Sequence, residues 1–285
     1  MEVLHDYEQF KALYRKTSQR FSKIYSNCPL PNRAVTEALN NSEVYWEEYP
    51  QGLVIFSTYQ APEQFLKLFY FLGDINSFPQ IVTEKSMIIE ELDANGKRDA
   101  YIRQITDSLS NAGFIRTAEN HMVERQCDNP CISSELNERI ASLAEYGFRI
   151  VMDPADIDFS VITDLWRKNL KPTDLPSSHL SFPYSESTHL VCVFDPEKNV
   201  CGANWWECRG NVCEIRHTVT RSDFRRRHIG STMILFAVEQ ARISCCKTVF
   251  TYIEDKNTTS LNMYEKNGFH KNGKISIQFI KPAVL

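Results

Sequence analysis

The sequence predicts a mixed α+β fold in which a mostly antiparallel sheet is flanked by helices. Strand-like hydrophobic runs follow one another closely, the turns between them are short, and segments with helical spacing lie before and after them. Short turns favour antiparallel neighbours, because a parallel connection needs a dozen or more residues. The runs in the first half are 44–46, 53–56 and 66–71, and those in the second half are 190–194, 200–208 and 212–220.

The first half begins with a predicted helix. Asp6 is the expected N-cap, Gln9 follows three residues later, and hydrophobic residues recur at helical spacing as far as Tyr25. The prolines of 28–32 end this helix. After the strand-like runs come a further run at 86–89, a helix predicted over 99–112, and the pair Gly113-Phe114.

The second half repeats this alternation of strands and helices. Residues 127–131 have the composition of a linker, and a polar helix over 134–145 joins the halves. A strand at 148–152 and a helix capped near Asp156 or Asp158 follow. A strand is predicted at 249–253. The helix before it is expected to turn these residues inward: Ile234, Ala237, Val238, Ala241 and Cys245.

The chain therefore divides into an accessory α+β domain at 1–130, a linker helix at 131–147 and a second domain at 148–285. The phrase that ends in Gly113-Phe114 is a weaker echo of the one that ends in Gly268-Phe269. This echo suggests that the first half is a degenerate copy of the second, although an unrelated α+β domain is the alternative. Neither interpretation places a cofactor in the first half, because nothing there matches the arginine-rich loop described below.

Composition excludes several classes of protein. The 285 residues are 42% hydrophobic and 24% charged, with a formal net charge of -4, which does not favour a nucleic-acid partner. Hydrophobic runs stay short of the ~20 residues that span a membrane, and the first residues lack a signal-peptide pattern, so a cytoplasmic protein without a membrane partner is expected. The nine cysteines include the pair Cys127-x-x-x-Cys131, but no second ligand pair follows it. They are predicted to be reduced thiols, with no metal site.

Two motifs near the C-terminus carry chemistry. In the first, Arg225-Arg226-Arg227-His228-Ile229-Gly230, arginines and a glycine stand where a strand-like run gives way to a hydrophobic helix. Helix N-termini carry unpaired N–H groups and partial positive charge, so this arrangement predicts a phosphate site; an ordinary basic loop is the alternative. The second motif covers 257–269, directly after the strand predicted at 249–253.

Together these motifs resemble the two signature regions of the GNAT superfamily of acyl-CoA-dependent N-acyltransferases. The first signature reads Arg/Gln-x-x-Gly-x-Gly/Ala, and the second reads roughly Asn-x-x-Ala-x-x-Leu-Tyr-Glu-Lys-x-Gly-Phe. The resemblance covers about 148–280, so the second domain is expected to be GNAT-like and the whole chain is a possible tandem of GNAT-like domains. His228 departs from the pattern, because it stands where the family has its first glycine, and its side chain is expected to crowd a diphosphate.

The resemblance implies the order β-α-β-β-β-α-β-α-β, with the sheet splayed open beside the co-substrate. It also implies an N-acetyltransferase that moves an acetyl group from acetyl-CoA, or another acyl group from its CoA ester, to a primary amine of a small molecule or peptide by direct attack. Asn257 would bond the pantetheine arm or only cap its helix, and a backbone amide at Val219 or Thr220 would hold the oxyanion. The residues expected to bind the diphosphate of coenzyme A are Arg225, Arg226, Arg227, His228, Ile229, Gly230, Ser231 and Thr232.

Protonating the leaving thiolate is a role that the family gives to the tyrosine of its second signature, here Tyr264. The base is less determined: Glu214 is the first candidate and His217 the second. Side chains alternate along a strand, so Cys213, Ile215, His217 and Val219 are expected on one side and Glu214, Arg216 and Thr218 on the other. A β-bulge in this strand would reverse that assignment.

The acceptor is not identified by the sequence. Asn204, Trp205 and Trp206 lie on a strand beside the expected site and form either an aromatic pocket for the acceptor or part of the core. A non-catalytic sensor or scaffold that binds an acyl-CoA is the alternative to an enzyme. Longer acyl groups or aminoacyl-tRNA are further donors used by double-domain relatives, although the acidic net charge argues against tRNA. The oligomeric state is left open.

Overall fold

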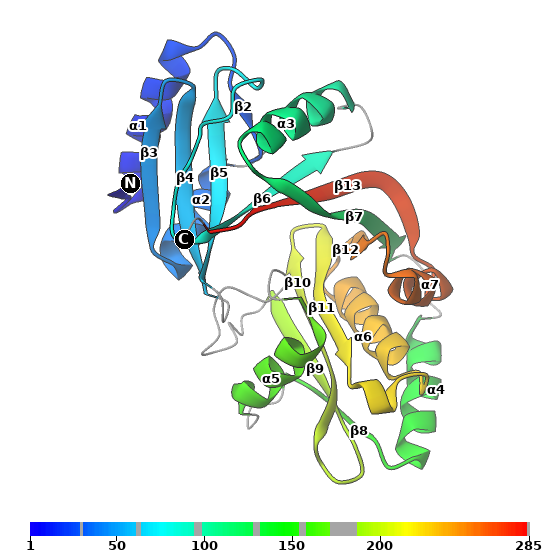
Figure 1. The fold of residues 1–285 in the computed structure, drawn as a ribbon. Helices are drawn as coiled ribbons and strands as arrows, with labels where there is room; N and C mark the ends of the chain where they lie inside the picture. The colour runs from blue at the N-terminus through cyan, green and yellow to red at the C-terminus, as the bar shows by residue number, and fades with distance from the viewer. Residues whose placement is uncertain are drawn as a thin grey trace. The chain divides into compact units, whose positions relative to one another are not determined.

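The computed structural model describes residues 1–28, 31–60, 64–93, 99–127, 132–153, 158–171 and 187–283. It divides into two compact units (Figure 1). The first comprises Met1–Asn120 and Gly273–Leu285, and the second comprises His121–Leu175 and His179–Asn272. Cys131 and the possible cap Asp156 lie outside the described residues.

The helices and strands alternate along both units. The helices are α1 (Tyr7–Arg20), α2 (Pro31–Asn41), α3 (Asp99–Asn111), α4 (Ile132–Glu145), α5 (Phe159–Asn169), α6 (Ile229–Ile243) and α7 (Thr258–Lys266), with a short 3₁₀ helix, η2 (Ser222–Phe224). The strands are β1 (Glu2–Val3), β2 (Tyr25–Ser26), β3 (Val44–Tyr49), β4 (Gly52–Gln60), β5 (Gln64–Leu72), β6 (Ser86–Asp93), β7 (Ile115–Gln126), β8 (Arg149–Met152), β9 (Thr188–Phe194), β10 (Val200–Arg209), β11 (Val212–Thr220), β12 (Thr248–Glu254) and β13 (His270–Lys281).

The first unit is built on the antiparallel meander β3-β4-β5, as predicted. β1 pairs with β3 at one edge of the sheet. β5 pairs with β6 in parallel at three positions, the last being Lys67↔Ile88, and β6 pairs on its other side with β13. Hydrophobic side chains fill both faces: α1 and α2 cover one, and α3 covers the other together with the loop 73–85.

A short piece of chain bridges β5 and β6 beyond their last parallel pair. β2 pairs with the far end of β5, and Asn27 follows directly after β2. The Asn27 side-chain amide donates to the carbonyls of Leu68 on β5, at 2.9 Å, and Glu90 on β6, at 3.4 Å. Its oxygen accepts the N–H of Tyr70 at 3.0 Å. The chain itself therefore occupies the opening between these two strands.

The second unit repeats the arrangement. β8, β9, β10 and β11 are antiparallel neighbours, and β11 pairs with β12 in parallel at three positions, the last being Glu214↔Phe250. Both strands continue past this pair, β11 to Thr220 and β12 to Glu254. α6 and α4 cover one face of the sheet, and α5 covers the other.

A β-bulge interrupts β11 and corrects the predicted alternation. The register with β10 shifts between Trp205, which pairs with His217, and Trp206, which pairs with Ile215. One residue of β11, Arg216, is therefore extra. As a result Cys213 and Ile215 face α6, whereas His217 and Val219 face α5. The four residues do not share one side, and Thr218 lies on the α6 side.

The fold class and most elements are confirmed. The Asp6 carboxylate accepts the N–H of Gln9 at 2.8 Å and caps α1, and Asp158 caps α5 by accepting the N–H of Ser160 at 2.9 Å. Cys245 is a correction, because α6 ends at Ile243 and Cys245 is exposed with a φ of 58°. α2 was missed, although Pro31 at its first position is a typical start signal.

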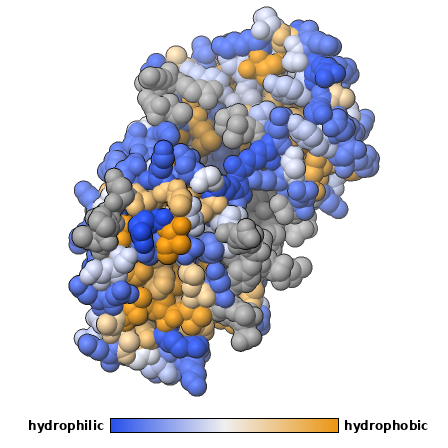
Figure 2. Space-filling model, turned by 180° about the vertical axis from the view of Figure 1, so that it is seen from behind, coloured by the Kyte–Doolittle hydropathy of each residue, from blue (hydrophilic) through white to orange (hydrophobic). Residues whose placement is uncertain are grey.

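The surface is mixed in character. Figure 2 shows the molecule from behind, where hydrophobic residues in orange reach the surface between hydrophilic ones. Among the exposed large hydrophobic residues are Val82, Tyr146 and Ile243, and single residues of this kind are ordinary on protein surfaces. Within the described ranges, no helix is both long enough and hydrophobic enough to cross a membrane.

Candidate active site

The arginine-rich loop leads into α6 through an unusual N-cap. His228 holds a left-handed backbone conformation, with a φ of 62°, and its side chain makes no capping hydrogen bond to the first turn within the described structure. The first N–H groups of a helix have no partner inside it. The amides of Ile229, Gly230 and Ser231 therefore stand at the positive end of the α6 dipole.

The three arginines beside these amides are exposed. Arg225 donates to the Thr220 carbonyl and to the Asn169 side chain, both at 3.3 Å. The Arg227 guanidinium lies over the Phe224 ring at 5.3 Å. Arg226 has a φ of 63°, so the backbone turns sharply here. The loop thus gathers positive charge around the start of α6.

The ring of His228 is held by a contact with α4. Its Nδ1 lies 2.7 Å from a guanidinium nitrogen of Arg139, which can only donate, so this ring nitrogen is the acceptor. Arg139 also pairs with Glu135 at 3.6 Å. The contact directs the imidazole ring towards α4, and it brings a fourth arginine near the loop.

Tight packing fixes the N-terminus of α6 against its neighbours. A Cβ added at Gly230 would lie 2.8 Å from the sulfur of Met263 on α7, and one added at Gly202 would lie 2.9 Å from Ile229. Asn267, which follows α7, donates to the Ser231 hydroxyl at 3.1 Å. The two signature motifs are therefore in direct contact.

Two predicted phosphate or pantetheine ligands already have hydrogen-bond partners. The Thr232 hydroxyl donates to the His228 carbonyl at 3.0 Å, and Thr232 is fully buried. Asn257 is the N-cap of α7 and accepts the N–H of Ser260 at 3.1 Å. The capping role of Asn257 is observed, and its contact with the pantetheine arm stays a prediction.

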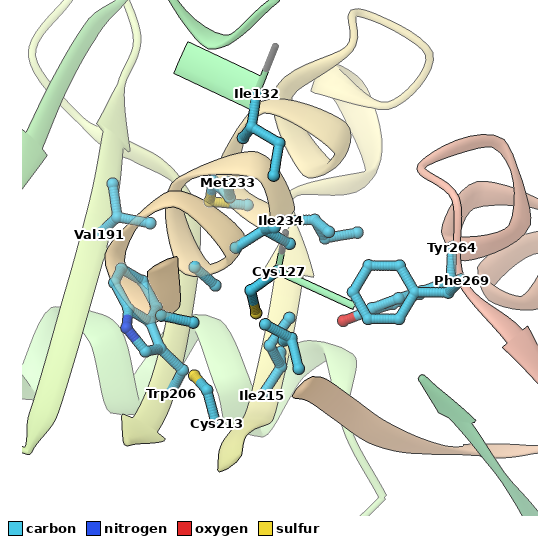
Figure 3. Close-up of a cluster of buried hydrophobic side chains, with 14 of the residues drawn as sticks. Cys127, Ile132, Val191, Trp206, Cys213, Ile215, Met233, Ile234, Tyr264 and Phe269 are labelled. Atoms are coloured by element: carbon cyan, nitrogen blue, oxygen red, sulfur yellow. The ribbon is translucent and has the colours of Figure 1, made fainter. Parts of the chain in front are cut away.

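Tyr264 belongs to a buried chain of hydrogen bonds. Its hydroxyl lies 3.0 Å from the Thr218 hydroxyl on β11. Thr218 donates to the Asn204 side-chain oxygen at 3.0 Å, and Asn204 donates to the Met233 carbonyl on α6 at 2.9 Å. Phe269 packs edge-on against the Tyr264 ring, with centroids 5.0 Å apart (Figure 3). The phenol is thus fixed beside the part of β11 that lies beyond its pairing with β12.

Burial determines the protonation state of this phenol. Desolvation raises the pKa of Tyr264 well above its ordinary value, and hydrogen bonds with Thr218 and Thr251 offset part of the rise. The hydroxyl therefore keeps its proton at neutral pH. A protonated phenol next to an open strand edge is able to donate a proton to a leaving group.

The backbone of β11 presents amides on the side of β12. The N–H of Arg221 bonds the Cys201 carbonyl on β10 at 2.8 Å. Because successive residues of a strand point their N–H groups to opposite edges, Val219 also points to β10, whereas Thr218 and Thr220 point to β12. Of the two predicted oxyanion donors, Thr220 is the one whose amide faces the open edge.

The two predicted bases lie in different surroundings. Glu214 belongs to the last residue pair between β11 and β12, and its carboxylate forms an ion pair with the Arg216 guanidinium at 3.0 Å. His217 lies edge-on against Trp166 and Trp205, with centroids 5.5 and 5.3 Å away. Burial, helped by the charge of Arg216, lowers the pKa of His217 to about 3. His217 is therefore neutral at physiological pH and a weak base.

The three residues considered for an acceptor pocket separate onto two faces of the sheet. Asn204 is fully buried in the Tyr264 chain, and Trp206 is fully buried in the cluster under α6 (Figure 3). Trp205 stacks on Trp166 of α5, with centroids 6.0 Å apart. Most of the surface of these side chains is therefore used in packing.

Sequence reasoning missed three residues that complete the site: Thr218, Thr251 and Arg139. Threonine is common in strands, so nothing marks Thr218 or Thr251 as partners of a tyrosine on a distant helix. Arg139 lies 89 residues before His228 in the sequence. Only the packing of α4 on α6 brings the two together.

Comparison with known proteins agrees with this geometry. Residues 160–269 match the acetyltransferase (GNAT) family. These residues form a GNAT domain. The matched segment contains the arginine-rich loop, α6, β12 and α7, and therefore the whole Tyr264 chain. No curated protein matches the chain.

Solved structures extend the similarity of fold to both units. A GCN5-related N-acetyltransferase from Kribbella flavida has a TM-score of 0.56 at 9% identity, over 90% of this chain and 96% of that one. A GCN5-related N-acetyltransferase-like protein from Streptococcus suis has a TM-score of 0.54 at 12% identity, over 94% and 98%. A tandem GNAT protein from the clavulanic acid biosynthesis pathway has a TM-score of 0.50 at 10% identity, over 94% and 86%. The family match and this fold support acyl transfer as the general activity.

Proposed function

We propose that the second unit is an N-acetyltransferase that moves an acetyl group from acetyl-CoA to the primary amine of a small molecule or peptide. The observation that carries the proposal is the contact between the two signature motifs. It sets the open amides of the α6 N-terminus and the protonated phenol of Tyr264 at two positions along the edge of β11 that faces β12.

The diphosphate of coenzyme A would bind the amides of Ile229, Gly230 and Ser231, because they carry the positive end of the helix dipole. The three exposed arginines of the loop would add charge, and the guanidinium fork suits phosphate oxygens. The pantetheine arm would then follow the open edge of β11, where the amides of Thr218 and Thr220 are available.

The reaction would proceed by direct attack of the amine on the thioester carbonyl. The Thr220 amide would stabilise the oxyanion, and Tyr264 would protonate the departing thiolate. Glu214 would be the base, because the lowered pKa of His217 makes that histidine a weak base. The ion pair of Glu214 with Arg216 must loosen when Glu214 takes a proton, directly or through water.

The test is to mix the purified chain with acetyl-CoA, measure binding by calorimetry, and follow thiol release with a panel of primary amines. Saturable binding with amine-dependent thiol release is the expected result. Absence of binding at high micromolar concentration contradicts the proposal.

A sensor that binds acyl-CoA without turnover is the second candidate. Two observations favour it: Glu214 is tied to Arg216, and the pKa of His217 is about 3. Binding without amine-dependent thiol release, across amines and acyl-CoAs of different chain length, would select the sensor. The same panel would identify an enzyme that prefers longer acyl groups.

A further inference from the structure

Four cysteines of the second unit gather near the turn that joins β10 and β11. Cys208 lies on β10, Cys213 on β11, Cys127 directly after β7 and Cys246 just before β12. All four are buried in one hydrophobic cluster, and Figure 3 shows Cys127 and Cys213 within it. The proposed acyl transfer uses none of these thiols.

The strand register places Cys208 directly opposite Cys213. A two-residue turn, Gly210-Asn211, separates the strands. The N–H of Cys208 bonds the Ser187 carbonyl at 2.7 Å, on the side away from β11, so the cysteines form a non-hydrogen-bonded pair. Such pairs hold their Cα atoms about 4.5 Å apart, within the span of a disulfide.

The thiols differ in acidity because they bond one another. A hydrogen bond from Cys213 is the main cause that lowers the pKa of Cys208, and hydrogen bonds from Cys246 and Ser244 lower it further, against the effect of burial. The same contact raises the pKa of Cys213. The contact with Cys213 therefore favours the thiolate of Cys208, which is the nucleophilic form of cysteine.

A histidine lies on the same face of the sheet. His189 pairs with Trp206, and its ring lies 5.9 Å from the Trp206 ring. The Nδ1 atom of His189 bonds Asp153 at 2.9 Å, and its buried Nε2 has no hydrogen-bond partner in the described part of the chain. The electrostatic effect of His189 is a minor cause of the lowered pKa of Cys208.

We propose that Cys208 and Cys213 form a reactive dithiol that a hydroperoxide converts to a disulfide. The Cys208 thiolate attacks one oxygen of the peroxide, and the O–O bond breaks. With hydrogen peroxide, the products of this step are a sulfenic acid on Cys208 and a hydroxide ion. The Cys213 sulfur then attacks the sulfenic sulfur of Cys208, and the S–S bond forms. The hydroxide displaced from the sulfenic sulfur takes the Cys213 proton and leaves as water. Two electrons pass from the dithiol to the peroxide.

A metal site is a less suitable assignment for this cluster. Among the residues that the structure describes, no group of three or more His, Cys, Asp and Glu side chains is arranged to hold a metal ion. The dithiol requires only the pair that β10 and β11 already hold in register. It is independent of the proposed acyl transfer.

The test uses the full chain with Cys245→Ser, which removes the exposed thiol, and one equivalent of hydrogen peroxide at neutral pH. Alkylation of the remaining thiols and trypsin digestion follow. Cleavage after Lys198, Arg209 and Arg216 separates the two cysteines, so the disulfide joins peptide 199–209 to peptide 210–216. The expected product is this linked pair, lighter by two hydrogen atoms than the free peptides and separated by a reductant.

Two variants complete the design. Cys213→Ser should abolish the link and leave Cys208 as a sulfenic acid that a dimedone probe captures. Cys201→Ser is the matched control, because Cys201 lies in the same peptide as Cys208 and burial raises its pKa to about 12, so the link should persist in this variant. Loss of the link in Cys201→Ser, a link to Cys246, or no link at all overturns the proposal.

Discussion

The two units share a meander followed by a parallel strand, and they differ at the opening beside that parallel pair. In each, a meander is followed by a parallel neighbour that pairs at three positions and then parts from it. In the first unit, Asn27 and β2 occupy the edge of β5 that is no longer paired with β6. In the second unit, Thr218 and Thr220 direct their amides to the equivalent edge. The shared topology therefore supplies an opening, and local sequence decides whether a ligand has access to it.

The connection after the meander differs as well. Residues 73–85 of the first unit form turns and loop, and Ile75, Phe78 and Ile81 pack from it into the core. The second unit places η2, the arginine-rich loop and α6 at this point. A helix N-terminus attracts phosphate, whereas a hydrophobic loop in its place does not.

The third difference lies at the position of Tyr264, the proposed acid. Four residues before the Gly-Phe pair, the second unit has Tyr264 and the first has Leu109, both buried. The β4–β5 register runs unbroken from Gly52↔Leu72 to Gln60↔Gln64, whereas β11 carries the bulge. The first unit thus keeps the packing role of this helix but lacks the phenol that we propose as the proton donor.

The comparison predicts one acyl-CoA site for each chain. Titration of the full chain with acetyl-CoA should saturate at one equivalent, because within the described residues the second unit combines this helix terminus with an open strand edge and the first unit does not. Calorimetry gives this number directly. Two equivalents, or crosslinking of a photoreactive CoA analogue to the first unit, would break the comparison.

Replacing Tyr264 by Phe tests the difference in acid. Acyl transfer should fall about 10²–10⁴-fold, the usual contribution of a positioned acid or base, while the acetyl-CoA dissociation constant stays the same. Steady-state thiol release and calorimetry measure the two quantities. Tyr146→Phe is the matched control, since Tyr146 is 70% exposed. Equal turnover in both variants would show that Tyr264 only packs, as Leu109 does.

The bulge predicts a specific response to acid. The pKa of His217 is about 3 in the folded chain and 6.5 without the folded surroundings. As the pH falls, the unfolded chain therefore takes up this proton before the folded chain does. Stability should be unaffected above pH 6.5 and should fall by about 1.4 kcal/mol per pH unit below it, towards pH 3.

In His217→Phe, the free energy of unfolding should fall less steeply between pH 6.5 and pH 3, because phenylalanine can pack between Trp166 and Trp205 without a titrating group. Urea unfolding at a series of pH values measures the slope. The exposed His228, replaced in the same way, is the control. An unchanged slope in His217→Phe would mean that the ring titrates in the folded state.

The sequence predicted the elements that local signals mark, and it did not predict their partners. Turn residues and caps such as Asp6 and Asp158 act over a few positions, so they can be read directly. The register shift at Arg216 depends on β10 and carries no local signal. The unit boundaries also depend on distant pairing: β13 follows α7 in sequence but pairs with β6, so Gly273–Leu285 falls in the first unit rather than with 148–272.

The smallest expected effect comes from opening the first unit. Asn27→Ala removes three hydrogen bonds and leaves buried backbone groups of Leu68 and Tyr70 without this partner, which costs about 1–3 kcal/mol. The loss should appear as a lower unfolding midpoint in urea, with Asn32→Ala on the exposed surface of α2 as the control. If Asn27→Ala also raised the binding stoichiometry to two, the bridge alone would account for the difference between the units. If stoichiometry stays at one, as we expect, the missing helix terminus is the larger cause.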